Sequence, residues 1–328
     1  MVGSEQSNFE IDEAWYPKPN ATKSSRLLET VDTLFDWSEV RTLLATAYTN
    51  FGRPGIDPVL GFKALLLQKM YQLSFPELED QLGDRDSFRR FVGLPRGAAA
   101  PDFSTLHKFR DRLQLHKLLD RLFAQLESNL RAGGLVLKQG TLIDASFIES
   151  SRHPPESGAE TPLSPETLGP RSQLDRGAET AKKNNRSHYG YKCHVGVDRG
   201  SGLIRRQTLT GARPHDVNFI GQLLCGDETA VFADRGYDAK EWHDWCRERG
   251  IVDGIMRQDR TKKERAEHPR TDENNGHERK RKAVERVFAA LKRVRSTACS
   301  LTLERCIADF TLWCIGYNLK RSFVLIKG

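Results

Sequence analysis

Three acidic residues of this sequence stand where an α/β protein would place metal-binding groups. Asp144 lies inside the apolar run LIDASFI, which is typical of a buried strand, and a carboxylate among apolar neighbours is costly unless a cation meets it. Asp234 follows the short apolar run VFA, and ligands of open α/β sheets gather at the carboxyl ends of strands. Glu285 lies in the basic stretch 277–295, which has eight Lys and Arg and two Glu.

Each acid also has a simpler interpretation. Asp144 could pair with an arginine, Asp234 could cap the next helix, and Glu285 could pair with Arg281 one turn earlier. Taken singly, these interpretations are favoured for Asp234 and Glu285. Taken together, a strand acid, a strand-end acid and a helix acid in this order favour a metal site. The acids are 90 and 51 residues apart, so the fold must bring them together.

The chemistry of such a site follows from its ligands. Mg²⁺ and Mn²⁺ prefer carboxylate oxygens, and no Cys/His set near the acids suggests zinc. Two divalent ions roughly 3.5–4 Å apart can activate a nucleophile and stabilise the leaving oxygen in phosphodiester cleavage. The three acids therefore predict metal-dependent phosphoryl transfer.

The stretch 277–295 predicts an amphipathic helix that carries Glu285. Its apolar residues recur at helical spacing: Val284, Val287, Phe288, Leu291 and Val294. At about 100° per residue, Arg281, Glu285 and Lys292 share one row beside that stripe. We expect this helix to lie on a polyanion and to hold one carboxylate within its reach.

The first 134 residues predict an all-helical N-terminal domain. Asp57-Pro58 opens a helix with proline at its first position, and Ser74-Phe75-Pro76-Glu77 is a capping box. Ser104 could cap a further helix, which carries Lys108, Arg110 and Arg112. Short helices followed by a basic one are compatible with a helix-turn-helix DNA reader. A helical packing or dimerisation domain is an equally good interpretation.

After Gly134 the sequence predicts an α/β domain, 135–328, with a mixed sheet. Strands are expected at 135–137, 141–148, 188–198, 203–210, 230–233 and 251–256, and helices at 216–224, 239–249 and 277–295, with an apolar helix to follow. Residues 150–187 are rich in Pro, Ser, Glu, Arg and Gly and predict a long flexible insertion. Asp216 is most simply the N-cap of its helix, although an accessory metal or DNA contact is compatible with its position.

The net charge is divided unevenly between these two domains. Residues 1–134 carry 17 basic and 18 acidic groups, and residues 135–328 carry 34 and 26. An isoelectric point near 9.1 with the excess in one half favours a nucleic-acid partner. We find neither a signal-peptide pattern nor an apolar run of membrane-spanning length, so we expect a cytoplasmic, nucleoid-associated protein with no membrane partner.

From about residue 55 to its end, the sequence resembles bacterial insertion-sequence transposases of the DDE type. The matching motifs are DASFIES, HYGYKCHVGVD, ADRGYD and RKAVERVFAALKR, and the helical block DPVLGFKALLLQKMYQLSFPELEDQL precedes them as in that family. The resemblance implies a ribonuclease H-like catalytic domain. The tyrosine that the family commonly has three residues before the arginine is replaced here by Glu278.

By this resemblance, Asp144, Asp234 and Glu285 are the catalytic acids and the metal ligands, with Mg²⁺ or Mn²⁺ as cofactor. Arg281 and Lys292 occupy the basic positions of the family's Arg-x3-Glu-x6-Lys motif. The implied partner is double-stranded DNA, both the terminal inverted repeats and the target, bound by a homodimer or larger assembly. Lys192, Lys108, Arg110 and Arg112 are further candidates for DNA contact, and a solvated edge lysine explains Lys192 equally well.

The implied reaction is cleavage at the element ends, followed by joining of the freed 3′-hydroxyl to target DNA. A structure-selective nuclease or ribonuclease H of the same fold would cut without joining. A catalytically silent DNA-binding regulator would not need the three acids.

Overall fold

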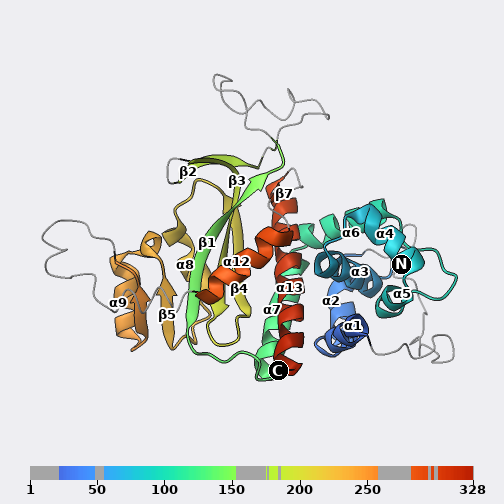
Figure 1. Cartoon of the computed structure of the whole chain (residues 1–328), viewed down its shortest axis with the longest axis horizontal. Helices are drawn as coiled ribbons and strands as arrows, with labels where there is room; N and C mark the ends of the chain where they lie inside the picture. The colour runs from blue at the N-terminus through green and yellow to red at the C-terminus, as the bar shows by residue number, and fades with distance from the viewer. Residues whose placement is uncertain are drawn as a thin grey trace, which may run out of the picture. The chain divides into compact units, whose positions relative to one another are not determined.

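The computed structural model describes residues 22–48, 55–152, 175, 177–183, 186–257, 282–294, 297–298 and 302–327 (Figure 1). The chain divides into two compact units: Met1–Val136 with Thr311–Gly328, and Leu137–Phe310. Within the described residues, no helix is both long and apolar enough to cross a membrane.

The first unit is helical. Its helices are α1 (Lys23–Thr33), α2 (Trp37–Ala45), α3 (Pro58–Tyr71), α4 (Phe75–Asp84), α5 (Asp86–Val92), α6 (Phe103–Leu115), α7 (Leu118–Ala132) and the second part of α13 (Leu303–Lys327). The predicted capping box at α4 is confirmed, because Ser74 and Glu77 exchange both hydrogen bonds. The predicted cap of α6 is wrong. Asp102, not Ser104, accepts from the Thr105 backbone N–H at 2.8 Å, and Ser104 Oγ donates to the same carboxylate.

Two close approaches hold this helical unit together. A Cβ on Gly61 of α3 would lie 2.8 Å from the ring of Phe109 on α6, so these helices meet where α3 has no side chain. On α13, a Cβ on Gly316 would be 3.4 Å from Lys69 Cβ of α3. The last residues of the chain therefore pack against a helix formed by its first quarter.

In the second unit, the described residues form a seven-stranded mixed sheet. Its strands are β1 (Thr141–Ser150), β2 (Glu179–Lys183), β3 (Arg186–Asp198), β4 (Ile204–Gly211), β5 (Ala230–Ala233), β6 (Val252–Ile255) and β7 (Thr297–Ala298). The order is β2-β3-β1-β5-β6, with β4 also paired to β3 and β7 to β1. β2, β3, β4 and β1 pair antiparallel, whereas β5, β6 and β7 join in parallel. This confirms the predicted class, a ribonuclease H-like mixed sheet flanked by helices and preceded by a helical region.

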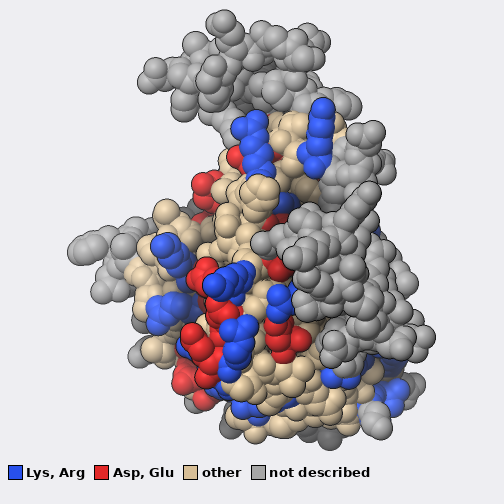
Figure 2. Space-filling view, turned by 90° about the vertical axis from the view of Figure 1, so that its left-hand side faces the viewer, with Lys and Arg blue, Asp and Glu red and all other residues tan. Residues whose placement is uncertain are grey.

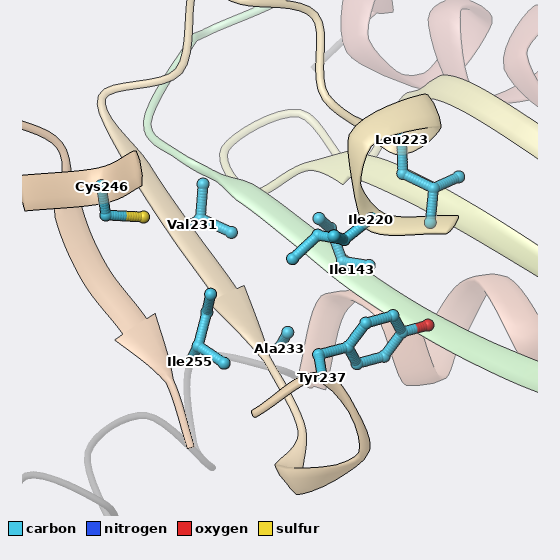
Figure 3. Close-up of a cluster of buried hydrophobic side chains, with 8 residues drawn as sticks. All are labelled: Ile143, Ile220, Leu223, Val231, Ala233, Tyr237, Cys246 and Ile255. Atoms are coloured by element: carbon cyan, nitrogen blue, oxygen red, sulfur yellow. The ribbon is translucent and has the colours of Figure 1, made fainter. Parts of the chain in front are cut away.

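One face of this sheet carries a closed hydrophobic core. Strand residues Ile143, Val231, Ala233 and Ile255 meet helix residues from α8 (Ile220–Leu223), the 3₁₀ turn η3 (Arg235–Tyr237) and α9 (Lys240–Glu248) (Figure 3). Gly196 of β3 belongs to the same face, since a Cβ there would lie 2.3 Å from the Leu223 carbonyl oxygen. Side chains alternate along a strand, so Asp144, the neighbour of Ile143, is directed to the opposite face.

The opposite face is covered by α12 (Lys282–Val294). Val284, Val287, Phe288 and Leu291 are buried as the periodicity predicts, and a fully buried helix stripe of this kind contributes about 1.5–3 kcal/mol per side chain. Figure 1 shows α12 lying across the sheet beside β1.

One prediction about the loops is wrong, and another is contradicted only at Glu179–Lys183. Residues 135–137 form no strand, because the backbone N–H groups of Leu137 and Lys138 donate to the Asp198 carboxylate, at 3.2 and 2.9 Å, instead of to a neighbouring strand. Within the predicted insertion 150–187, β2 pairs with β3 as a hairpin. Residues 153–174 lie outside the described residues.

Candidate functional site

Asp144 and Asp234 are aligned across two neighbouring parallel strands. Thr141 pairs with Val231 and Leu142 with Phe232, so continuing the register by two residues sets Asp144 level with Asp234. Residues at the same level of parallel neighbours are directed to the same face of the sheet. The register thus brings together two acids that are 90 residues apart in the chain.

The sheet divides beside Asp144. One edge of β1 pairs with β3 from Thr141 to Glu149. Among the described residues, its other edge pairs with β5 at 141–142 and with β7 at 149–150 only. Asp144 lies between these two contacts and is half-buried, with Oδ1 accepting from the Ala145 backbone N–H at 2.8 Å.

Asp234 begins a tight turn at the end of β5. It is the N-cap of η3, and its Oδ1 accepts from the Gly236 backbone N–H at 2.8 Å. Because a Cβ on Gly236 would lie 2.9 Å from this oxygen, the turn favours glycine at that position. Tyr237, the last residue of η3, is fully buried in the core of Figure 3 and anchors the turn.

Glu285 and Lys292 lie exposed on α12. The thiol of Cys193 on β3 is buried, and burial raises its pKa to about 12, while the charge of Lys292 lowers this pKa and that of Asp144 raises it. A carboxylate of β1 and an ammonium of α12 therefore both lie within electrostatic range of one sulfur. Arg281, the other basic residue of the row, lies outside the described residues.

Lys192 is not a solvated edge lysine. Its Nζ forms an ion pair with Asp216 Oδ1 at 2.9 Å and donates to the Pro214 carbonyl at 2.8 Å, and the residue is 8% exposed. A phosphate would have to displace these partners, so the structure does not favour Lys192 for DNA contact. Asp216 is also not a helix cap, because it is the first residue of the 3₁₀ turn η2 (Asp216–Phe219), whose N-cap is His215.

The three basic candidates on α6 differ in their exposure. Lys108 and Arg112 are exposed, and the Arg112 guanidinium lies 4.7 Å from the Tyr48 ring centroid. Arg110 is 1% exposed, pairs with Asp111 at 2.8 Å and contacts His107. A guanidinium buried to this degree is not accessible to a phosphate. Lys108 and Arg112 therefore remain candidates for DNA contact, and Arg110 does not.

Charges of both signs are interspersed on the face of the molecule that carries α9. Figure 2, which views the side on which α9 lies in Figure 1, shows Lys and Arg intermingled with Asp and Glu. On α9 itself, Arg247 pairs with Asp244 at 2.6 Å. Mixed charges of this kind are typical of a solvated helix face, so this surface does not favour a polyanion.

The donor set of the three acids fits a hard divalent cation. All three donors are carboxylates, two of them aligned by the register, and such oxygens are the ligands that Mg²⁺ and Mn²⁺ prefer. Among the described residues, a different group has potential metal-ligand atoms that all lie within 4.8 Å of one another. It consists of Cys225, Asp227 and Glu228. Its carboxylates already have partners.

These partners give the second cluster a structural role. Glu228 accepts from the backbone N–H groups of Cys225 and Gly226 at 2.6 and 2.8 Å. Asp227 pairs with Arg205 at 2.7 Å and with Lys138 at 3.1 Å. The cluster thus closes the loop before β5.

Comparison with known proteins gives two family matches. Residues 137–319 match the model of the transposase DDE domain, and residues 16–112 match that of a transposase domain designated DUF772. A solved structure, the synaptic complex of piggyBac transposase with hairpin DNA, is similar at 11% sequence identity and a TM-score of 0.48. That similarity covers 94% of this chain and 78% of the other.

Proposed function

This chain belongs to the family of transposases with a DDE domain, and from that premise we propose that Asp144, Asp234 and Glu285 are its catalytic acids. The protein binds the terminal inverted repeats of its own insertion sequence, cleaves the DNA at the element ends, and joins the freed 3′-hydroxyl to target DNA. The observation that carries the proposal is the register of β1 and β5, which aligns Asp144 with Asp234 beside the helix of Glu285.

Each of the three acids has its own part in this reaction. Asp144 and Asp234 would hold Mg²⁺ or Mn²⁺ from the sheet, and Glu285 would hold it from α12. The cation pair, when bound, activates the attacking oxygen and stabilises charge on the leaving one. Lys292, two turns along α12 from Glu285, binds a phosphate next to the scissile bond, and Arg281 is proposed to do the same.

The DNA partner follows from this chemistry and from the exposed Lys108 and Arg112 of α6. Two element ends must be held together for joining, so we propose a homodimer or larger assembly on DNA. Because the substrate is chromosomal DNA, the bacterial nucleoid is the expected place of action.

A supercoiled-plasmid assay tests the proposal. The donor plasmid carries the DNA that flanks this gene, and wild type is compared with Asp144→Asn, Asp234→Asn and Glu285→Gln in Mg²⁺ or Mn²⁺. A matched control is Glu241→Gln, which changes an exposed acid of α9. We expect cleaved and joined products from wild type and from the control, and neither product from the three site variants.

Other outcomes would favour other functions. Cleavage without joined products would favour a structure-selective nuclease. DNA binding without cleavage in all the proteins would favour a catalytically silent regulator, and normal activity of Asp144→Asn would overturn the assignment of the acids.

A further inference from the structure

His243 of α9 is a buried histidine held between two carboxylates. Its Nε2 lies 2.9 Å from Asp238 Oδ1, and its Nδ1 lies 2.6 Å from Asp253 Oδ2. The residue is 3% exposed. Both ring nitrogens face acceptor oxygens, which the imidazolium form satisfies because it carries a donor on each nitrogen.

The two contacts of His243 connect it to different elements. Asp253 lies on β6, where it pairs in register with Val231 of β5. Asp238 is the C-cap of η3, the turn whose N-cap is Asp234. The contact with Asp253 therefore ties α9 to the sheet, whereas the contact with Asp238 ties α9 to the turn that begins at Asp234.

This turn has few ways to move. It spans three residues, and its backbone hydrogen bonds run from Tyr237 N–H to the Asp234 carbonyl and from Asp238 N–H to the Arg235 carbonyl, at 3.1 and 3.3 Å. At one end, β5 fixes Asp234. At the other, the His243 contact holds Asp238, so a displaced Asp238 would shift the turn, including the Gly236 N–H that donates to Asp234 Oδ1.

We propose that His243 is a positioning residue that acts through Asp238 to aim the Asp234 carboxylate at a divalent cation. This inference rests on the proposed function, which makes Asp234 a metal ligand. Groups that orient a ligand in this way affect metal affinity by about 10–100-fold when they are removed. A simple staple between α9 and β6 would affect stability alone.

Replacing His243 by Gln or by Asn distinguishes a positioning role from a purely structural one. The amide nitrogen of each new side chain takes the place of a different ring nitrogen. The amide nitrogen of Gln occupies the position of Nε2 and can still donate to Asp238, whereas that of Asn occupies the position of Nδ1 and can still donate to Asp253. The readout is the affinity of the full-length protein for Mn²⁺ without DNA, measured from the electron paramagnetic resonance signal of free Mn²⁺. Thermal unfolding of each variant accompanies it.

We expect His243→Asn to weaken Mn²⁺ binding by about tenfold or more and His243→Gln to retain most of the affinity. Asp253→Ala, which removes the other contact, should also retain it. Equal weakening in the Asn and Gln variants, or no weakening in either, would overturn the proposal. If His243→Asn does not fold, Asp238→Ala, which removes the acceptor of this contact, provides the same test, with loss of affinity expected.

Asp234→Asn distinguishes failure of this inference from failure of the proposed function. If Asp234→Asn weakens Mn²⁺ binding and His243→Asn does not, the assignment of Asp234 as a metal ligand is supported and His243 has no positioning role. If Asp234→Asn binds Mn²⁺ as wild type does, Asp234 is not a ligand and the proposed site itself is wrong.

Discussion

Asp144 on β1 and Asp234, the residue after β5, each stand two residues beyond the last paired residues of these parallel strands. Two carboxylates held side by side repel each other, and a bound divalent cation would remove that repulsion. The protein is therefore expected to be more stable with its metal than without it.

Thermal unfolding should report the stabilisation of the protein by its bound metal. Mg²⁺ or Mn²⁺ at ten times its dissociation constant should stabilise wild type by about 1.4 kcal/mol, since ligands that bind only the native state act by mass action. Chelation should reverse the shift. Asp144→Asn should unfold at the same or a higher temperature than metal-free wild type and should not respond to the metal. A metal-induced shift of equal size in Asp144→Asn would show that the cation binds elsewhere.

The Lys192–Asp216 pair should matter for stability and not for DNA affinity. The two side chains are 10% and 19% exposed, and removing one partner of a buried pair costs about 3 kcal/mol or more. We expect Lys192→Met and Asp216→Asn each to lower the free energy of unfolding, and the double variant to lower it by much less than the sum of the two. Urea unfolding measures all three.

The exposed Lys182 of β2 provides a control for the Lys192 and Asp216 variants, and Lys182→Met should change the free energy of unfolding little. The salt dependence of DNA binding provides a second measurement. A lost phosphate contact lowers the slope of log affinity against log salt by about one, and we expect no such change for Lys192→Met. A reduced slope would restore Lys192 as a DNA contact.

The buried His194 should make stability depend on pH. Burial lowers the pKa of His194 to about 4, more strongly than Asp216 raises it, and Lys192 lowers it further. Because the folded pKa is below the unfolded value, stability is unaffected above pH 6.5 and falls as the pH decreases from 6.5 to 4, by about 3 kcal/mol in all. Unfolding in urea between pH 7 and pH 4.5 should show a smaller loss for His194→Gln. An equal loss of stability with decreasing pH in wild type and in His194→Gln would contradict this prediction.

The N-terminus of α6 depends on Asp102. Hydrogen bonds from Ser104 and Thr105 hold the pKa of the Asp102 carboxyl well below its usual range. Loss of an N-cap side chain destabilises a helix, so Asp102→Ala should lower the unfolding temperature and Ser104→Ala should lower it by less. Thermal unfolding of the two variants ranks them, and a larger cost for Ser104→Ala would restore Ser104 as the cap.

The sequence predicted the elements whose periodicity is set by burial. The stripe of α12 and the run containing Asp144 each repeat apolar residues at the spacing of their own secondary structure. The strand β2 was missed because its sequence, ETAKK, has no apolar alternation. Leu135 to Leu137 has the composition of a strand, yet the Leu135 N–H donates to the Leu130 carbonyl. The N–H groups of Leu137 and Lys138 donate to the carboxylate of Asp198, which is some 60 residues away in the chain.

The sequence indicates the residue types of the candidate site but not its geometry. A spacing of 90 residues has meaning only once Thr141 is paired with Val231. The contacts of His243 join a turn, a helix and a strand, and no local pattern marks them. Charge alone suggested Lys192 and Arg110 as DNA contacts, because sequence does not show that Asp216 and Asp111 already pair with them.

The membership of α13 in both units has a consequence for how this protein is made. Residues from Thr311 onward group with Met1–Val136, and Lys320 lies 5.9 Å from the ring of Tyr71. Domains usually fold on the ribosome from the N-terminus onward, but this helical unit cannot be completed until nearly the whole chain has been synthesised. A fragment that ends at Val136 would expose the surface of α3 that the last helix covers, so an autonomous helical module would have to be made by joining the two distant segments with a linker.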